Sequence, residues 1–413
     1  MKSTTKTTDP AINYAPLYWL AAGTFAVGTE AFMIAALLPK IASDVSVSLP
    51  AAGQLVTIFA LAYAVSSPVL TALTGGFDRR KVLILAMTAF AASNLVAASA
   101  SSYWSLAGAR FLLAVCAGIY TPSATALAGA LVPPDRRGLA LAIVTGGTSL
   151  AVALGVPLGA LIGSRFGWRM TFVAVAALSI AALAGLIFRI PPDIGQGLPS
   201  TTLRTRIAVV RQTGTLSALL VTTLWGVGTY ANYTFITPMF MNGLGFDGVE
   251  MSVVLFLWGA SACAGLLLGG MASDRIGNRR VISFALLTLM CALFSLSLSA
   301  WFLTVAGALV PVLFVAAVWG FSAWAFFPAQ QARLIEIAGT HVAPVVLSLN
   351  ASFMYLGFSC GAVLGSLTLT LGKLSDLGWV GALGELLALV YFQVITQNHR
   401  KPHLNAAACR PAN

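Results

Sequence analysis

This chain contains many apolar runs, each about long enough to cross a bilayer as a helix. These runs limit the folds that the chain can adopt. A helix needs about 20 apolar residues to cross the hydrocarbon core, so the chain has room for about twelve spans with short connections. Only 8% of its 413 residues are charged, whereas a soluble domain carries about 25%. A water-exposed surface cannot be assembled from this composition. The sequence therefore predicts a polytopic, all-α membrane protein.

Gly, Pro and charged residues divide the apolar runs into two sets of six. We expect the first helices at 17–39, 51–73, 82–100, 103–130, 139–163 and 170–189. We expect the second set at 216–240, 250–272, 281–300, 303–328, 345–370 and 379–396. Between the sets lies the one long polar connection, with three prolines and four arginines. The predicted domains are residues 1–188, a linker of 189–215, and residues 216–413 with a short tail.

Internal repetition supports this division. The charge-dense loop 270–280, which contains Asp274, has a shorter copy, Asp78-Arg79-Arg80-Lys81, 196 residues earlier. A second offset, 206 residues, relates Pro122 to Pro328 and also relates two Gly-x-x-x-Gly pairs. These pairs are Gly155 with Gly159 and Gly361 with Gly365. Glycines at this spacing let membrane helices approach closely, and a shared offset indicates a duplicated six-helix unit.

The net charge of +11 does not indicate nucleic-acid binding, because the basic residues alternate between loops. On the predicted spans, 18 of the 23 Lys and Arg residues fall at alternate loops and at both termini. This is the positive-inside pattern, and it predicts that both termini are cytoplasmic. The first apolar run is too long for the core of a signal peptide. The five cysteines show no pairing or metal-site spacing, so we expect no metal site.

Three ionisable side chains fall inside predicted helices: Glu30, Arg110 and Glu385. Such residues are rare in membrane helices and are functional candidates by default. From the helical rise, Glu30 and Arg110 both lie about 10–14 Å below the membrane surface, so they can pair. Two interpretations stay open: a static ion pair, or a carboxylate that exchanges a proton as its distance from Arg110 changes. For Glu385, in the last helix, we expect an interfacial or structural role, with proton handling as the alternative.

Several motifs resemble those of the major facilitator superfamily. The loop 270–280 resembles the family's loop motif. Arg110 lies in a segment, 106–118, that resembles the fourth-helix arginine motif, and Gly155-Val-Pro157-Leu-Gly159 resembles the fifth-helix antiporter motif. With the segments 28–39 and 328–331, the set resembles the twelve-helix drug:proton antiporter subfamily, near arabinose-efflux-type and purine or nucleoside efflux permeases. The resemblance covers about residues 17–390 and implies twelve transmembrane helices in two pseudo-symmetric six-helix bundles.

The expected substrate residues lie in the predicted seventh and tenth helices. Tyr230, Tyr233 and Thr237 follow i, i+3, i+7 spacing and would share a helix face, with Asn232 beside them. Trp324 and Gln331 offer similar groups at the tenth helix. Aromatic rings with hydroxyl and amide groups suit a planar or polyhydroxyl solute. Packing of the same rings against neighbouring helices is the alternative explanation.

The loop motifs are expected to gate the transporter. Asp274 can accept hydrogen bonds from Arg275, Arg279 or a helix N-terminus, and Gly277 permits the turn. The first copy lacks the turn glycine. We therefore expect Asp274→Asn to impair transport more than Asp78→Asn. The full set of expected gating residues is Asp78, Arg79, Arg80, Gly270, Asp274, Arg275, Gly277, Arg279 and Arg280.

The resemblance implies proton-coupled export of a small organic solute from a bacterial cytoplasm, by alternating access of the two halves. Drug, purine or nucleoside, and sugar efflux stay open, as does a uniporter or substrate sensor of the same fold. The sequence contains no nucleophile-elbow or H-E-x-x-H motif, which argues against a membrane-embedded enzyme. It also contains no P-loop, so the chain itself cannot hydrolyse ATP to drive transport. We expect a monomer in the inner membrane, with solute, protons and lipid as partners, without cofactor or nucleic acid.

The charge asymmetry makes a testable prediction about topology. Fused after residue 413, green fluorescent protein should be bright and alkaline phosphatase inactive, because both report a cytoplasmic C-terminus. Fusions at the predicted loop 40–50 should show the opposite pattern. An active phosphatase at the C-terminus would overturn the predicted orientation.

Overall fold

The computed structural model describes residues 14–192, 194, 202–243, 245–246, 248–302 and 305–408. Within them the chain forms helices joined by short turns and contains no strand. The first half has α1 (Ala15–Asp44), α2 (Leu49–Leu73), α3 (Arg79–Ala98), α4 (Tyr103–Ala130), α5 (Arg137–Leu150), α6 (Val156–Phe166) and α7 (Trp168–Arg189). It is followed by α8 (Leu203–Arg211), α9 (Thr215–Tyr233), α10 (Ile236–Pro238), α11 (Gly248–Ile276), α12 (Asn278–Phe302), α13 (Val305–Ala338), α14 (Ala343–Leu371) and α15 (Asp376–Ala408).

Eleven helices of the described chain are long and apolar enough to cross a membrane, counting α5 and α6 as one span. A twelfth span passes the same test as the pair α8 and α9, which are bent by 92° at the break between them. The predicted all-helical, multi-span fold is confirmed. The predicted linker, 189–215, falls partly outside the described residues, and its described part includes a helix, α8, that we had not expected.

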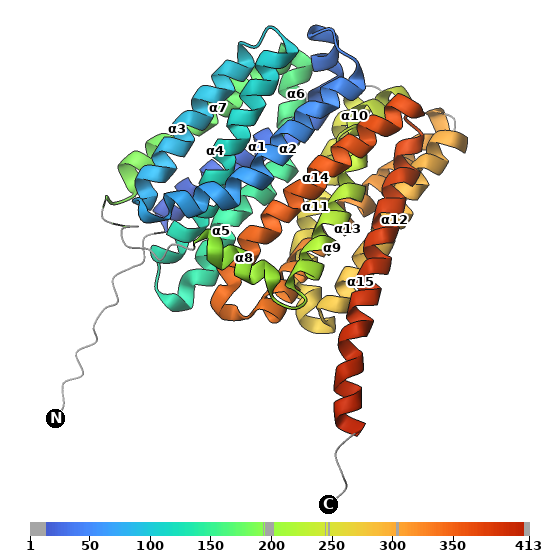
Figure 1. Cartoon of the computed structure of the whole chain (residues 1–413). Coiled ribbons are helices and arrows are strands. Elements are labelled where there is room, and N and C mark those ends of the chain that lie inside the picture. Colours follow the sequence, from blue (N-terminus) through green and yellow to red (C-terminus); the bar gives the residue numbers. More distant parts are fainter. Residues whose placement is uncertain are drawn as a thin grey trace, which may run out of the picture.

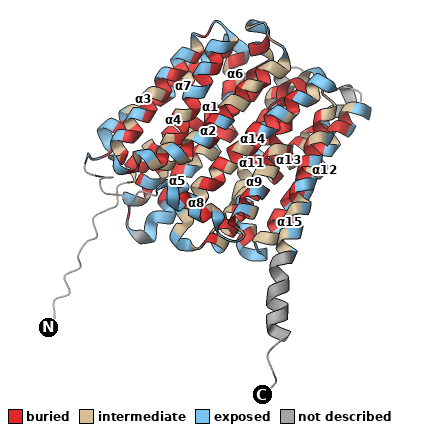
Figure 2. Ribbon diagram, viewed as in Figure 1, coloured by how far each residue is buried: buried red, intermediate tan, exposed pale blue. Residues whose placement is uncertain are grey.

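The helices form two groups that lie side by side in Figure 1, α1–α7 and α9–α15. In the first group α3 packs on α4 and α7, and in the second α12 packs on α13 and α15. The groups meet where α2 packs on α14, where α11 packs on α6, and where α1 packs on α10. Buried residues follow the faces between helices, and exposed residues cover the outside (Figure 2). We propose that the boundary between the groups is residues 189–215.

Glycines set the closest helix approaches, in the same way in each group. A Cβ on Gly155 would meet Thr29 of α1, and a Cβ on Gly159 would meet Met33. In the second group, a Cβ on Gly361 would lie 2.6 Å from the carbonyl oxygen of Val227 in α9, and a Cβ on Gly365 would approach Ala231 equally closely. The two Gly-x-x-x-Gly pairs therefore lie at equivalent interfaces, where small residues allow backbones to touch.

A π-helical turn, Ala151–Gly155, separates α5 from α6. Its cause is Pro157, which has no N–H to donate to the helix and so disrupts the regular ladder. The turn lies against α11 of the other group, where a Cβ on Gly259 would meet the carbonyl oxygen of Val152. The motif that contains Pro157 thus shapes a contact between the two halves.

The expected helix ends differ from the structure mainly at prolines. Pro39 lies inside α1 and Pro328 inside α13, which continues ten residues beyond the expected end at residue 328. Membrane helices tolerate internal prolines because neighbouring groups satisfy the freed carbonyls. The expected continuous helix 216–240 is wrong, because α9 ends at Tyr233 and is followed by α10 and a π-helical turn, Met239–Gly243.

This packing predicts opposite effects for two glycine substitutions. Gly361→Ala should destabilise the protein by about 1–3 kcal/mol, because the added methyl meets backbone atoms of α9 that cannot move aside. Gly108→Ala, in α4, meets nothing within 4 Å and should be neutral or stabilising by about 0.5–1 kcal/mol through helix propensity. Melting temperatures of the purified proteins test this, and equal shifts would contradict the packing argument.

Candidate functional site

A buried ion pair joins the first and fourth helices. Glu30 of α1 and Arg110 of α4 are both 0% exposed, and a guanidinium nitrogen of Arg110 donates to a carboxylate oxygen of Glu30. Arg110 also donates to the backbone carbonyl oxygens of Glu30 and of Leu55 in α2, both at 3.4 Å. The guanidinium lies 4.2 Å from the ring centre of Phe59. The arginine therefore holds together three helices of the first half.

The pair is only partly satisfied. Oε2 of Glu30 and Nη2 of Arg110 are buried and have no hydrogen-bond partner among the described residues. A buried ion pair gains from attraction but loses hydration, and it is stable only when its remaining polar atoms are also satisfied. Oε2 is thus the position on Glu30 at which a proton or a new donor would change the balance of the pair.

An aromatic cluster lies next to this pair, where the two halves meet. Phe32, two residues after Glu30, contacts Trp324 of α13 with ring centres 5.8 Å apart, and it contacts Tyr233 of α9 at 6.3 Å. Tyr230 of α9 stacks on Phe358 of α14, with ring centres 3.6 Å apart. Tyr230, Tyr233 and Trp324 were expected to line a substrate site, and the structure brings all three to this cluster.

The other expected substrate residues lie elsewhere. Asn232 faces α15, where its amide would collide with a Cβ on Gly381. Thr237 lies beyond the end of α9, so the helical spacing that grouped it with Tyr230 does not apply. Gln331 is half-buried. Its neighbour Gln330 is fully buried and donates to Ala218 O at 2.6 Å and to Thr222 Oγ1 at 3.1 Å, so it holds α13 against α9.

Among the described residues, three side-chain hydrogen bonds link helices of the first group to helices of the second. The hydroxyl of Tyr233 donates to the carbonyl oxygen of Phe32 at 3.1 Å. The hydroxyl of Ser359 in α14 donates to Thr57 O of α2 at 3.3 Å. The thiol of Cys263 in α11 donates to Ser149 O of α5 at 3.3 Å. Any relative motion of the halves at this level must break or slide these bonds.

Glu385 is a second carboxylate with no exposed surface. It lies in α15 against α9 and accepts a hydrogen bond from the hydroxyl of Thr229 at 3.0 Å. A Cβ on Gly228 would meet its carboxylate, so this glycine makes room for the side chain between the two helices. Glu385 is in none of the ion pairs of the described chain.

The first loop motif anchors two helices. Asp78 is the N-cap of α3, and its carboxylate accepts a hydrogen bond from the Arg80 N–H at 2.9 Å. The Arg80 guanidinium donates to Ile190 O at 2.9 Å and to Ile187 O at 2.7 Å, at the C-terminal end of α7. Arg79, the first residue of α3, is buried. This copy therefore ties the start of α3 to the end of α7.

The second copy is arranged differently. Asp274 lies within the last turn of α11, is exposed, and accepts no hydrogen bond from the described residues. Gly277, with φ +89°, makes the turn, as expected for a left-handed position that favours glycine. Arg279 donates to Gln393 of α15 at 3.4 Å, and Asn278 donates to Glu336 of α13 at 2.7 Å. Arg275 and Arg280 make no side-chain hydrogen bond within the described chain. A Cβ on Gly270 would lie 3.8 Å from the Pro328 ring of α13, an ordinary contact.

Sequence reasoning missed four aromatic residues of α2 and α14. Phe59 stacks on Arg110, Tyr63 stacks on Tyr355 with ring centres 3.8 Å apart, and Phe358 stacks on Tyr230. Tyr355 also contacts Phe59, with ring centres 6.2 Å apart. Their signal in the sequence is the four-residue spacing of Phe59 and Tyr63, which is typical of one helix face.

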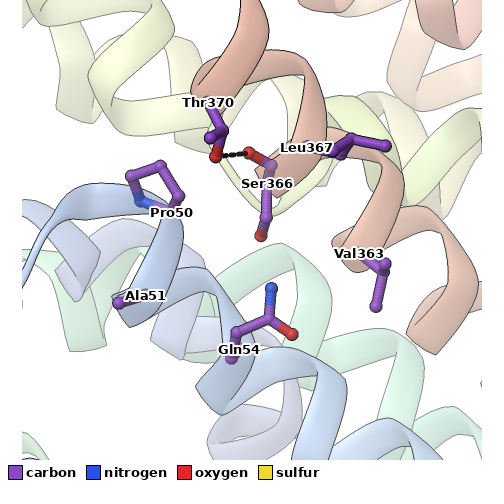
Figure 3. Close-up of a pocket in the computed structure, with 7 residues that line it drawn as sticks. All are labelled: Pro50, Ala51, Gln54, Val363, Ser366, Leu367 and Thr370. Atoms are coloured by element: carbon purple, nitrogen blue, oxygen red, sulfur yellow. Dashed lines mark hydrogen bonds between the residues drawn. The ribbon is translucent and has the colours of Figure 1, made fainter.

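A crevice opens on the surface between the halves. It has a volume of about 340 Å³ and is lined by residues of α2 and α14: Pro50, Ala51, Gln54, Val363, Ser366, Leu367 and Thr370. Figure 3 shows the Gln54 amide pointing toward Ser366 across it. The crevice contains none of the expected substrate residues.

Comparison with known proteins decides the family. The model of the Major Facilitator Superfamily matches residues 20–396. The chain belongs to the major facilitator superfamily. It is therefore a transporter with a small-molecule substrate, and not an enzyme.

Three relatives illustrate its position in the family. An uncharacterized MFS-type transporter, YbcL of Bacillus subtilis (strain 168), is 32% identical over 388 residues, which are 94% of this chain and 97% of that protein. The inner membrane transport protein YdhP of Escherichia coli (strain K12) is 31% identical over 392 residues, 94% and 97% of the two chains. A chloramphenicol resistance protein of Streptomyces lividans is 38% identical over 264 residues, 63% and 67% of the two chains.

The loop geometry predicts that Asp78 contributes more to stability than Asp274, whereas the sequence-based expectation that Asp274 matters more concerns transport and stays a prediction. Asp78→Ala removes the cap of α3 and should cost about 1 kcal/mol. Asp274→Ala removes an exposed carboxylate and should change stability by less than about 0.5 kcal/mol. Thermal unfolding of both variants in one detergent tests the difference, and a larger loss for Asp274→Ala would refute it.

Proposed function

We propose that this transporter exports a small organic solute in exchange for protons, by alternating access of its two halves. The observation that carries the proposal is the Glu30–Arg110 pair, fully buried two residues from the aromatic cluster at which the halves meet. Charged residues within a membrane are costly, so a carboxylate retained at this position supports a role in coupling.

Glu30 is the proton carrier in this proposal. A proton on Oε2, the oxygen without a hydrogen-bond partner in the described chain, would neutralise the carboxylate and weaken its attraction to Arg110. Arg110 would still donate to the Leu55 and Glu30 carbonyl oxygens and lie over Phe59. The guanidinium thus keeps hydrogen-bond acceptors and a ring contact when the pair weakens, so protonation can change the contact between α1 and α4.

The aromatic cluster is the proposed solute site. Tyr230, Tyr233, Trp324 and Phe32 surround one region between α1, α9 and α13 and offer ring faces and hydroxyl groups. Such a set suits an apolar or planar solute with a few polar groups. The relative from Streptomyces lividans, named for chloramphenicol resistance, supports export of an antibiotic-like solute. Asn232, which faces α15, is not part of the proposed site.

Alternating access requires the cluster to open. Phe32 and Tyr233 are linked by both a ring contact and a hydrogen bond, so solute that separates these rings also loosens α1 from α9. Because Glu30 lies on the same turn of α1 as Phe32, a shift of this turn changes the distance from Glu30 to Arg110. This shared turn is the proposed link between solute and proton.

The location in the bacterial inner membrane, with both termini in the cytoplasm and the protein as a monomer, is part of the proposal. The name of the Escherichia coli relative, an inner membrane transport protein, supports the location. The positive-inside pattern of the loops supports the orientation.

Glu30→Gln should abolish proton-driven transport and leave solute exchange measurable. Glutamine keeps a polar side chain of the same size but cannot exchange a proton. The measurement is uptake of chloramphenicol, as a first probe, into proteoliposomes with and without an imposed pH gradient, together with counterflow at equal pH. Glu385→Gln is the matched control, because it alters another fully buried carboxylate and should leave the pH-gradient effect intact.

Two outcomes would contradict the proposal. Full proton-driven uptake by Glu30→Gln would remove Glu30 from the coupling. Counterflow by the wild type without any effect of the pH gradient would identify a uniporter. A panel of nucleobases, nucleosides, sugars and antibiotics extends the same assay to other solutes.

A further inference from the structure

Glu385 is a buried carboxyl group that the proposed mechanism does not use. Its side chain has no exposed surface, and no ion pair of the described chain includes it. Oε1 accepts one hydrogen bond, from the uncharged hydroxyl of Thr229 in α9, at 3.0 Å. Oε2 is buried and has no hydrogen-bond partner among the described residues. The group therefore needs either a counter-charge or a proton.

Three glycines enclose this carboxyl group between α9 and α15. A Cβ on Gly228 would lie 2.6 Å from Oε1 of Glu385, and a Cβ on Gly384 would lie 2.8 Å from Cα of Gly228. A Cβ on Gly381, one helical turn before Glu385, would lie 2.8 Å from the carbonyl oxygen of Gly228. The two backbones are thus in contact beside the carboxyl group, which leaves little room there for a second long side chain.

No described cation forms an ion pair with Glu385. Helix α15 packs on α9, α12 and α14. Two arginines reach α15: Arg333 of α13 lies over the Phe392 ring, and Arg279 of α12 donates to Gln393. These contacts are seven and eight residues after Glu385, about 10–12 Å along the helix. The other ionisable groups among the described side chains of α15 and the three helices packed on it are Tyr230 and Tyr233 of α9, Arg280 and Cys291 of α12, Tyr355 and Cys360 of α14, and Asp376 and Tyr391 of α15.

An ionised carboxylate would be unfavourable in these surroundings. Burying a charge without a counter-charge is so costly that the group takes up a proton instead. A proton on Oε2 turns an unpaired acceptor into a donor. Asn232 of α9 lies against Gly381 at the same interface, and its Oδ1 is a buried acceptor without a partner in the described chain. A neutral acid thus matches the groups that α9 presents, a hydroxyl donor and an unpaired amide oxygen.

We propose that Glu385 is a proton-binding site that stays occupied at neutral pH, and that the neutral carboxylic acid holds α15 against α9. Glu30 differs, because Arg110 supplies its counter-charge. Thr229 directly precedes Tyr230, so the contact with Glu385 also helps to set the face that α9 turns toward the aromatic cluster. The inference depends neither on the identity of the transported solute nor on proton coupling by Glu30.

The first test is the melting temperature of the purified full-length protein as a function of pH. In the unfolded chain a glutamate ionises near about pH 4.3. From about pH 6 to about pH 9 the native state therefore holds one more proton than the unfolded state, and the stability contributed by Glu385 falls as the pH rises. Glutamine resembles the neutral acid and does not titrate. The wild-type melting temperature should therefore fall relative to that of Glu385→Gln, by about 2 °C per pH unit.

Asp135→Asn is the matched control, because it removes an exposed carboxylate whose only ion pair in the described chain is with its neighbour Arg136. Its melting temperature should follow that of the wild type across the same pH range. Parallel curves for the wild type and Glu385→Gln would overturn the inference.

Infrared spectroscopy detects the proton without reference to stability. A protonated carboxylic acid has a C=O stretching band that is separate from the bands of carboxylates and amides. At neutral pH the wild type and Asp135→Asn should show this band, and Glu385→Gln should lose intensity from it. An identical band in the wild type and Glu385→Gln would contradict the inference.

A bound metal cation is the alternative counter-charge for Glu385, and a salt exchange tests it. Replacing sodium chloride by choline chloride at equal ionic strength should leave the wild-type melting temperature unchanged. If the wild type loses stability in choline chloride and Glu385→Gln does not, a metal cation balances an ionised Glu385, and the assignment of a proton is wrong.

Discussion

The ion pair between Glu30 and Arg110 is the interaction on which this account of the transporter depends. Each charge offsets part of the cost of burying the other among apolar helices. Together they hold α1 to α4, while Arg110 also reaches α2 through Leu55 and Phe59. Arg110 thus joins three helices of the first half, and in the proposed mechanism a proton on Glu30 would weaken this link.

Close packing makes a local change at this pair affect the whole bundle. Glycines bring α6 onto α1 and α14 onto α9, so the two halves use equivalent interfaces to hold the helices that carry the proposed site. The π-helical turn caused by Pro157 bears on α11, and the Tyr233 hydroxyl bonds to α1. A shift of α1 at Glu30 therefore meets the other half within one turn, at Phe32. Contacts of this kind have discrete arrangements, which is what alternating access requires.

Much of the fold, and part of the site, could be predicted from the sequence. The expected span 103–130 coincides with α4, because bilayer thickness and the serine cap before Tyr103 both mark its limits. Glu30 and Arg110 were predicted to lie at the same depth in the membrane and therefore to be able to pair, and they do pair. Three expectations were wrong. Pro328 does not end α13, and α9 ends at Tyr233 instead of continuing to residue 240. Asp274 lies inside α11, whereas Asp78, its counterpart in the first half, caps α3. Arg206 was assigned to a linker, and only tertiary packing shows that it is buried.

The most direct test of the central claim is proton release when solute binds to the purified protein. A pH-sensitive dye in weakly buffered detergent solution measures it without a membrane or a gradient, using whichever solute the transport panel identifies. We predict that solute binding releases protons from the wild type, because the shared turn of α1 links the aromatic cluster to Glu30. Glu30→Gln should bind the solute without that release. Equal release from both proteins would contradict the claim that Glu30 couples solute to protons.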